Sequence, residues 1–460
     1  MRFFIFLIPL SLLSCAGLPM DPTPSSPSAY PTYLSHHFII ASTKRIAPPS
    51  NAPVENRTSG KYIKTWNLNR AKKIEGQDEG RKTGAYTPIN GLAVQGFSAV
   101  NYFPAHQTAW FLSDNGAGNK QNSTDYLLYL IPFHFNFIHA TLKQGPALFL
   151  SDPYKQCPFR IVQENTPSRY LTGGDFDPES MQWVGDTLWI GEEFGPFLLK
   201  FNRQGQLKKV FPIYLNDQAL ISPDHPQYIS SPHPQVPSPF NIKRSKGIEG
   251  MAISNDKKKL YLLLEGPIFL PQANRFEQFK GHFFLRILEF DLVHERFTGR
   301  SWKYLLENNQ NAIGDFTMIN QDTGLVIERD DYGGGQNFSC TTHKAPCFKK
   351  PATFKRVYKI HLDKDNVNQF AIKEGYIDLL HIKDPHNKHK KPLDGKNFSF
   401  PFFTIEDIAL IDPQHLLIAN DNNYPFNANR FPNQQDDTEI IILDVGHFLI
   451  DSPIKDGEKK

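Results

Sequence analysis

The sequence predicts an all-β fold, a β-propeller with five visible repeats of about four strands each and with long loop insertions. The first observation is a phrase that recurs five times, in which two short apolar strands are joined by a turn and end on acidic residues. The second is composition, because 13% aromatic residues and 36 prolines suit many short strands joined by turns. The third is that no long stretch has the period of an amphipathic helix. Repeated four-stranded units are typical of propellers.

The chain begins with a predicted signal peptide, residues 1–14. Arg2 precedes the apolar run Phe3–Leu13, which is too short to cross a bilayer. The run ends at Leu-Leu-Ser-Cys15, which resembles the lipobox of bacterial lipoproteins. That resemblance implies a lipid on Cys15 and a place in the cell envelope, at the outer membrane or in the periplasm. An ordinary secretory signal, and so a secreted protein, is the alternative.

Residues 15–60 are predicted to form a flexible tether, because from residue 18 onward the segment is rich in Pro, Ser and Thr. The propeller domain is placed at residues 61–452, and residues 453–460 are a C-terminal tail. Lys61–Leu68 is expected to form a strand that pairs with Glu439–Asp444 and closes the ring.

Five copies of the phrase follow in order along the chain. They run from Phe97 to Asn115, from Asp177 to Glu193, from Gly247 to Glu265, from Gly314 to Asp330 and from Ile405 to Asn422. Their spacing is irregular and exceeds the about 40 to 50 residues that a blade needs. The excess is predicted to form insertions at residues 217–246, 271–282, 331–355 and 384–400. A sixth blade within residues 134–176 stays open, so five or six blades are expected.

The acids of the repeats are predicted to gather in one channel, since the inner strands of all blades converge there. Acids at equivalent positions would form two rings. The first ring contains Glu179, Glu249, Asp315 and Glu406, and the second contains Asp114, Glu192 or Glu193, Glu265, Glu328 and Asp421. Crowded carboxylates repel one another unless protons or a cation neutralise them, and oxygen ligands favour a hard divalent ion such as Ca²⁺. The alternative is that these acids only bind the amides of turns.

Two repeats resemble the phrases of a known family. Pro-Glu179-Ser-Met with its later Gly-Glu192-Glu193, and Ile-Glu249-Gly-Met with its later Glu265, are similar to the Glu-Gly phrases of the phytase-like propeller family. That family is described as having an esterase-like activity of phytase. The more distant alkaline β-propeller phytases hold several Ca²⁺ ions in an acidic channel and hydrolyse phosphomonoesters.

The resemblance implies roles for particular residues. The residues expected to hold metal or activate water are Glu179, Glu192, Glu193, Glu249, Glu265, Glu406 and Asp421, and Asp315, Glu328 and Asp330 join them by repeat position alone. The expected catalytic residues are Glu179, Glu249, Glu406 and Arg329. Pairing of Arg329 with Glu328 or another nearby acid is the alternative for that residue. Two positions depart from the family pattern, since Ser98 replaces an acid and Ser180 replaces a common glycine.

Basic residues just before the third repeat, Lys243, Arg244 and Lys246, are candidates for binding an anionic substrate. A solvated loop is the alternative. A second basic stretch, Lys383–Lys391, is expected to be a surface loop. The overall charge is balanced, at +3 from 50 Lys+Arg and 47 Asp+Glu, and so gives no reason to expect a nucleic acid partner.

Three cysteines remain after Cys15. Cys340 and Cys347 flank a short polar loop and are expected to form a disulfide in an exported protein. Cys157 has no obvious mate and is expected to be a partly buried thiol.

These features together favour an exported hydrolase of phosphate esters that acts through divalent ions held by carboxylates in the channel. Its expected partners are a small anionic substrate and a membrane reached only through the lipid, and the protein is expected to be a monomer. No Gly-x-Ser-x-Gly motif supports serine-esterase chemistry. Two alternatives stay open: a non-catalytic, Ca²⁺-stabilised binding or scaffold lipoprotein, and a metal-dependent hydrolase of lactones or carboxyl esters.

Overall fold

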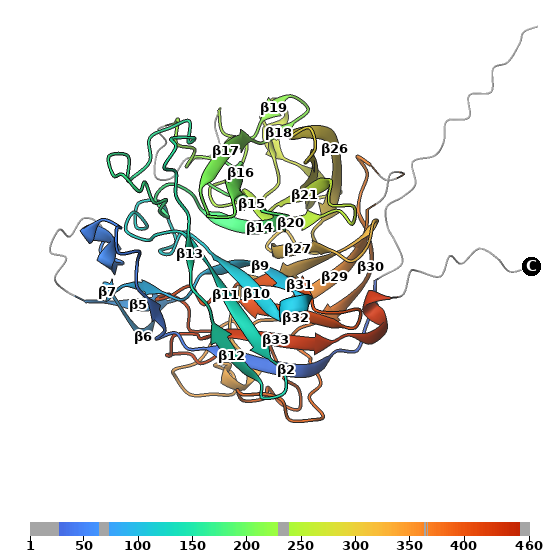
Figure 1. The fold of residues 1–460 in the computed structure, drawn as a ribbon. Coiled ribbons are helices and arrows are strands. Elements are labelled where there is room, and N and C mark those ends of the chain that lie inside the picture. Colours follow the sequence, from blue (N-terminus) through green and yellow to red (C-terminus); the bar gives the residue numbers. More distant parts are fainter. Residues whose placement is uncertain (1–26, 64–72, 229–238, 363–364, 366, 451–460) are drawn as a thin grey trace, which may run out of the picture.

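The computed structural model describes residues 27–63, 73–228, 239–362, 365 and 367–450, and these form an all-β molecule. Most strands belong to five antiparallel sheets, seen as the separate groups of arrows in Figure 1. None of the described residues belongs to a helix long and apolar enough to cross a membrane. The predicted signal peptide and Cys15 lie outside the described residues.

Each of the five sheets is one blade, and we number the blades in chain order. Blade 1 consists of β9 (Phe97–Phe103), β10 (Thr108–Ser113), β11 (Tyr129–Asn136) and β12 (Thr141–Gln144). Blade 2 consists of β14 (Pro178–Val184), β15 (Thr187–Glu192), β16 (Phe197–Asn202) and β17 (Leu207–Pro212). Blade 3 consists of β20 (Ile248–Ile253), β21 (Lys259–Leu264), β25 (His282–Asp291) and β26 (Arg296–Leu305).

The last two blades also recruit strands from the N-terminal part of the chain. Blade 4 consists of β27 (Ala312–Met318), β28 (Thr323–Arg329), β29 (Lys355–His361), β30 (Ile372–Asp378) and the parallel β1 (Ser28–Ala29). Blade 5 consists of β31 (Ile405–Leu410), β32 (His415–Asn420), β33 (Thr438–Asp444) and β2 (Tyr33–Ile40).

The innermost strands β9, β14, β20, β27 and β31 close a ring, because each contacts the next and β31 contacts β9. The ring therefore has five members, and the propeller has five blades. The candidate sixth blade is absent from the described chain, since residues 150–176 make only isolated bridges.

Apolar side chains fill the five spaces between neighbouring blades. Between blades 1 and 2, for example, Leu112 and Leu130 pack with Met181 and Ile190. The other four interfaces hold equivalent clusters. Burial of a side chain of this size contributes about 1.5 to 3 kcal/mol, so these interfaces are the main source of the ring's stability.

The ring is closed by β2 and not by Lys61–Leu68. β2 pairs antiparallel with β33 along its whole length, from Tyr33 opposite Asp444 to Ile40 opposite Thr438. Lys61–Ile63 belong to no strand, and residues 64–68 lie outside the described part. The expectation of a disordered tether over residues 15–60 is therefore wrong for residues 33–40. Leu34, Phe38 and Ile40 are buried on this strand, but the Pro- and Ser-rich composition of the surrounding segment favoured the prediction of a tether.

Five short two-stranded sheets of the described chain lie outside the blades. They are β3 (Arg45–Ile46) with β8 (Leu92–Ala93), β4 (Thr58–Ser59) with β7 (Ile89–Asn90), β5 (Ile74–Asp78) with β6 (Arg81–Thr87), β18 (Tyr214–Leu215) with β19 (Gln218–Ala219), and β22 (Phe269–Leu270) with β23 (Arg275–Phe276). Two more short strands, β13 (Leu148–Phe149) and β24 (Gln278–Phe279), pair with β11 and β25. The insertion between β28 and β29 contains a disulfide between Cys340 and Cys347, and Cys157 is buried.

Candidate metal centre

The inner strand of each blade carries a β-bulge near its beginning. In blade 3, Ile248 lies opposite Leu264 and Gly250 lies opposite Leu263, so Glu249 is an extra residue. The same extra residue is Ser98 in blade 1, Glu179 in blade 2 and Glu406 in blade 5. A bulge re-aims the side chain of its extra residue out of the regular ladder. The first-ring acids Glu179, Glu249 and Glu406 are therefore bulge residues, placed alike in blades 2, 3 and 5.

Blade 4 departs from this pattern. Its irregularity covers Gly314 and Asp315, because Ile313 lies opposite Glu328 and Phe316 opposite Val326. The residue that follows Ile313, and so matches Glu249 and Glu406, is Gly314. Asp315 stands one position later and accepts hydrogen bonds from the N–H of Phe316 and of Ile408 in blade 5. Asp315 is thus not a member of the first ring.

The second ring lies where the second strand of each blade ends. The N–H of Asp114, Glu193 and Glu265 each donates to the carbonyl of the residue just before the inner strand. The matching residue of blade 4 is Arg329, which lies opposite Ala312 in the ladder. One blade therefore places a cation where the others place an acid, and Glu192 and Glu328 stand one residue too early.

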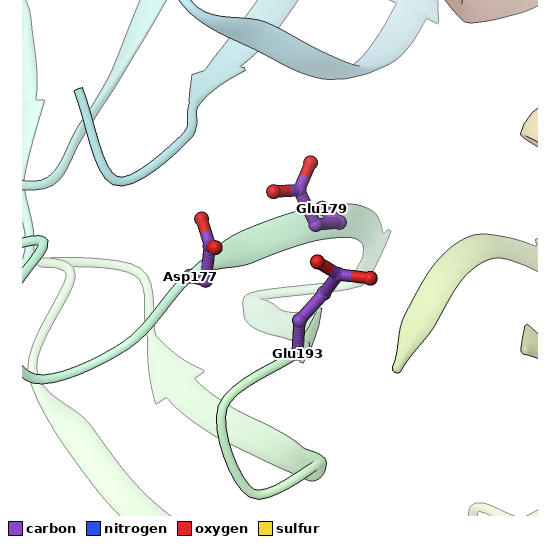
Figure 2. Close-up of side chains that lie close together, drawn as sticks. All are labelled: Asp177, Glu179 and Glu193. Carbon is purple, nitrogen blue, oxygen red and sulfur yellow. The ribbon is translucent and has the colours of Figure 1, made fainter. Parts of the chain in front are cut away.

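Carboxylates of blades 2 and 3 gather into two groups that could hold a metal ion. Asp177, Glu179 and Glu193 form the first group, and Glu193, Glu249 and Glu265 form the second. Within each group, one oxygen of every residue lies within 4.8 Å of the others. Figure 2 shows the first group, with Asp177 and Glu179 at the start of β14 and Glu193 on the loop after β15. Glu193 belongs to both groups and so joins them into one centre.

These acids sit in a strongly unfavourable environment for negative charge. Burial first, and then neighbouring carboxylates, raise the pKa of Asp177 to about 6 and that of Asp114 to about 8. The same two causes hold the pKa of Glu179 and Glu249 well above their usual range. Protons or cations must therefore neutralise part of the centre.

Two basic side chains of the protein lie against the acids. Lys246 pairs with Glu265, and the Arg329 side chain, only 4% exposed, places Nη2 at 3.3 Å from Glu406 Oε1. Arg329 also donates to Asp331 at 2.7 Å. Arg329 therefore pairs with Glu406 and Asp331, and no ion pair joins it to Glu328 in the described structure.

Three predicted metal ligands, Glu192, Glu328 and Asp330, lie outside the two groups and contact other parts of the protein. Glu192 accepts hydrogen bonds from the N–H of Phe194 and Gly195. Glu328 accepts from Tyr304 and pairs with Lys373 at 2.8 Å. Asp330 pairs with the buried Lys355 and accepts from Thr353. The structure therefore places these three residues outside both groups, each held by contacts within the protein.

Asp421 also lies outside both groups. Its carboxylate accepts a hydrogen bond from the N–H of Asn423 at 2.7 Å. Burial, and next the charge of Asp114, hold the pKa of Asp421 well above its usual range. Asp114 and Asp421 thus continue the acidic surface from blade 2 toward blades 1 and 5.

A cavity of about 750 Å³ adjoins the second group and includes Glu265 in its wall. Lys243 and Lys246 also line it. The Lys243 ammonium lies 4.5 Å from the Phe276 ring centroid and, among the described residues, has no carboxylate partner. Arg244 instead pairs with Asp224. The three predicted anion-binding residues thus differ, and Lys243 is the one whose charge no described acid neutralises.

Asp177 is the ligand candidate that the sequence reasoning missed. It stands where blades 1 and 3 have Gly96 and Gly247, just before the inner strand. Alignment of the repeats on their bulges would have revealed an acid two residues before Glu179.

The part of the chain that carries this centre matches a known protein family. A family model described as "Phytase-like: Esterase-like activity of phytase" matches residues 92–424. The chain belongs to the phytase-like family. The matched region begins at β8 and runs through the second strand of blade 5, so it contains every acid of both groups.

Solved structures that resemble this phytase-like chain do so weakly. A luciferin-regenerating enzyme is 9% identical, with a TM-score of 0.32. The matched region covers 76% of this chain and 92% of that enzyme's chain. A putative 6-phosphogluconolactonase from Bacteroides fragilis is 12% identical, with a TM-score of 0.31, and covers 76% and 87%. The comparison with curated proteins gives no match. The fold assignment therefore rests on the strand register and the family match.

Proposed function

We propose that this protein hydrolyses phosphate esters at the joined carboxylate centre of blades 2 and 3, with divalent ions bound there. The observation that carries the proposal is the position of Glu193, which belongs to both carboxylate groups. A carboxylate shared in this way can bridge two cations, and two neighbouring cations are a common device for phosphoryl chemistry.

The residues present fit a hard divalent ion. Every donor in the two groups is a carboxylate oxygen, which is the ligand type that Ca²⁺ prefers. The acids outnumber the adjacent cations, so a bound ion would relieve their repulsion. When bound, such ions lower the pKa of water and stabilise negative charge on phosphate oxygens.

The chain's own cations are placed to complement a phosphate. Lys246 stands beside Glu265, and Arg329 stands on the next blade beside Glu406. Positive groups that are fixed before the reaction stabilise charge that develops in the transition state. Glu249 accepts no hydrogen bond from any described residue, which leaves its carboxylate available to orient water or take up its proton.

The adjoining cavity would hold the organic part of the substrate. Its wall combines Lys243 with the amide side chains of Asn308 and Gln310 and the rings of Phe283 and Phe354. Cations favour a phosphate or another anionic substrate over a neutral lactone or carboxyl ester, which needs the same acids and fewer positive groups.

Export and lipid attachment at Cys15 belong to the same proposal. They are supported by the apolar run before Cys15 in the sequence. The Cys340–Cys347 disulfide supports them as well, because such bonds persist mainly in oxidising compartments.

The test is to purify the protein, measure its metal content, and assay phosphomonoester, phosphodiester and lactone substrates with and without chelator. We expect bound divalent metal and phosphoesterase activity that chelation abolishes. Activity on lactones alone would favour the carboxyl-ester alternative. Bound metal without turnover on any substrate would favour the scaffold alternative, and a protein that neither binds metal nor loses stability on chelation would rule out the centre.

A further inference from the structure

A basic loop, defined here as Lys383–Lys391, carries positive charge on the outside of the propeller. It contains four lysines and one aspartate, and Lys383, Lys388 and Lys390 are exposed. The Asp384 carboxylate is buried and bonded to His389, 2.6 Å away, while Lys391 pairs with Asp437. No carboxylate of the described chain pairs with the three exposed lysines.

The basic loop is fixed to β2, the outermost strand of blade 5. The N–H of Lys383 donates to the carbonyl of Thr32 at 3.0 Å, and the N–H of Leu34 donates to the carbonyl of Lys383 at 2.8 Å. Farther along, the N–H of Lys390 donates to Nδ1 of His37 at 2.9 Å. The loop therefore lies along β2, on the outer edge of blade 5.

The register of blade 5 sets the direction of this edge relative to the carboxylate centre. Tyr33 and His415 both lie opposite Asp444, at one end of the blade. Ile405, next to the bulge residue Glu406, lies opposite Asn420 at the other end. Tyr33 and the adjacent Lys383 thus lie at the end of blade 5 that is away from its acids.

We infer that the basic loop binds the anionic headgroups of a phospholipid bilayer, so that the acidic end of the channel faces away from that bilayer. This inference goes beyond the proposed hydrolysis. It adds a second membrane contact, made by the folded domain, to the contact that the proposed lipid on Cys15 would make. The chain from Cys15 to Ser28 can span at most about 45 Å, so a lipid on Cys15 would keep near the membrane the outer edge of blade 4, where Ser28 pairs with Gly375, and the β2 strand that soon follows it. Attraction to a charged surface decays over about 8 Å at physiological salt, so the loop must contact the headgroups.

The test uses the full chain with Cys15→Ser, so that no lipid contributes, and measures its sedimentation with vesicles. We expect binding to phosphatidylcholine vesicles that contain phosphatidylglycerol, weaker binding as salt is raised, and none to phosphatidylcholine alone. Each lysine near such a surface contributes about fivefold, so changing Lys383, Lys388 and Lys390 together to Gln should weaken binding about a hundredfold. The matched control changes Lys344, Lys349 and Lys350 to Gln, which removes the same charge from the insertion at the acidic end of blade 4, and should bind normally.

Equal binding of the loop variant and the unmodified chain would overturn the inference, as would an equal loss in the control variant. Retention on heparin without binding to vesicles would also overturn it, in favour of a soluble polyanion. A second measurement does not depend on weakened binding: a fluorophore on Lys388→Cys should be quenched by spin-labelled lipid, and one on Lys349→Cys should not. Equal quenching would overturn the orientation. Circular dichroism confirms that each variant is folded.

Discussion

At the scale of single residues, the carboxylates of the centre differ in what else they bind. Glu193 accepts a hydrogen bond from the N–H of Gly247 at 2.9 Å, and Glu265 is paired with Lys246. Glu249 lies between them in the second group and receives no hydrogen bond from the described chain. Glu249 is therefore the acid whose replacement should affect chemistry most and folding least.

Glu249→Gln is expected to lower kcat by about a hundredfold or more, the usual contribution of a positioned acid–base group. Thermal stability should be unchanged or higher in chelator, because one of the repelling charges is gone. The measurement is kcat on the best phosphate ester, with the melting temperature recorded in parallel.

The control for this variant is Glu328→Gln, a buried acid outside both groups. It should lower stability through its bonds to Tyr304 and Lys373 and leave the bound metal unchanged. Full activity of Glu249→Gln would remove that residue from the mechanism.

A variant of Arg329 tests the second-ring position of blade 4, where a cation stands in place of an acid. Arg329→Met leaves Glu406 buried without its partner, and breaking such a pair costs about 3 to 5 kcal/mol. We expect that loss in the free energy of unfolding, measured by urea denaturation in chelator. The double variant with Glu406→Gln should recover part of it, and no recovery would mean that the two side chains are not coupled.

At the scale of elements, two features position the site: the repeated bulge and the closing strand. The bulge gives each inner strand one residue outside the ladder, and that residue is an acid in blades 2, 3 and 5. Blade 4 has Gly314 there because a Cβ on it would lie 1.8 Å from the carbonyl oxygen of Ile405. The backbone of blade 5 thus excludes any side chain at this position.

The closing strand β2 holds blade 5 in the ring. Phe38 is 1% exposed, and its ring packs edge-on against Phe135 of blade 1. We expect Phe38→Ala to cost about 3 to 5 kcal/mol in the free energy of unfolding, measured by urea denaturation. Ser35→Ala on the same strand is the control and should change it by less than about 0.5 kcal/mol. Similar values for the two variants would contradict the closing role of β2.

At the scale of the whole molecule, the balanced charge of the chain conceals a strongly uneven distribution. Acids concentrate at one end of the channel, while the exposed lysines of the basic loop lie on the outer edge of blade 5. Burial raises the pKa of Glu406 to about 7 and that of Asp114 to about 8. The folded protein without metal therefore keeps protons that the unfolded chain, with carboxyl pKa values near 4, has lost.

This difference predicts how stability depends on pH. In chelator, the free energy of unfolding should fall as pH rises from about 5 to 8, because the folded state binds more protons than the unfolded state in that range. Added Ca²⁺ should reduce or reverse the fall by taking the place of the protons. The measurement is the melting temperature against pH with chelator and with Ca²⁺. A melting temperature that rises with pH in chelator would contradict the charge crowding.

The sequence by itself determined the repeat, the all-β class and most acids of the centre, because equivalent residues of a propeller repeat must meet around one axis. Glu179, Glu193, Glu249 and Glu265 were found in this way. Only the tertiary structure decided which acids lie together, since Glu193, Glu249 and Glu265 meet within 4.8 Å while Glu192, Glu328 and Asp330 lie outside both groups. It also decided that Arg329 enters the ring, because register depends on a bulge that composition does not reveal. The closing strand also depends on tertiary structure. Tyr33–Ile40 becomes a strand by pairing with Thr438–Asp444, which is far from it in the sequence.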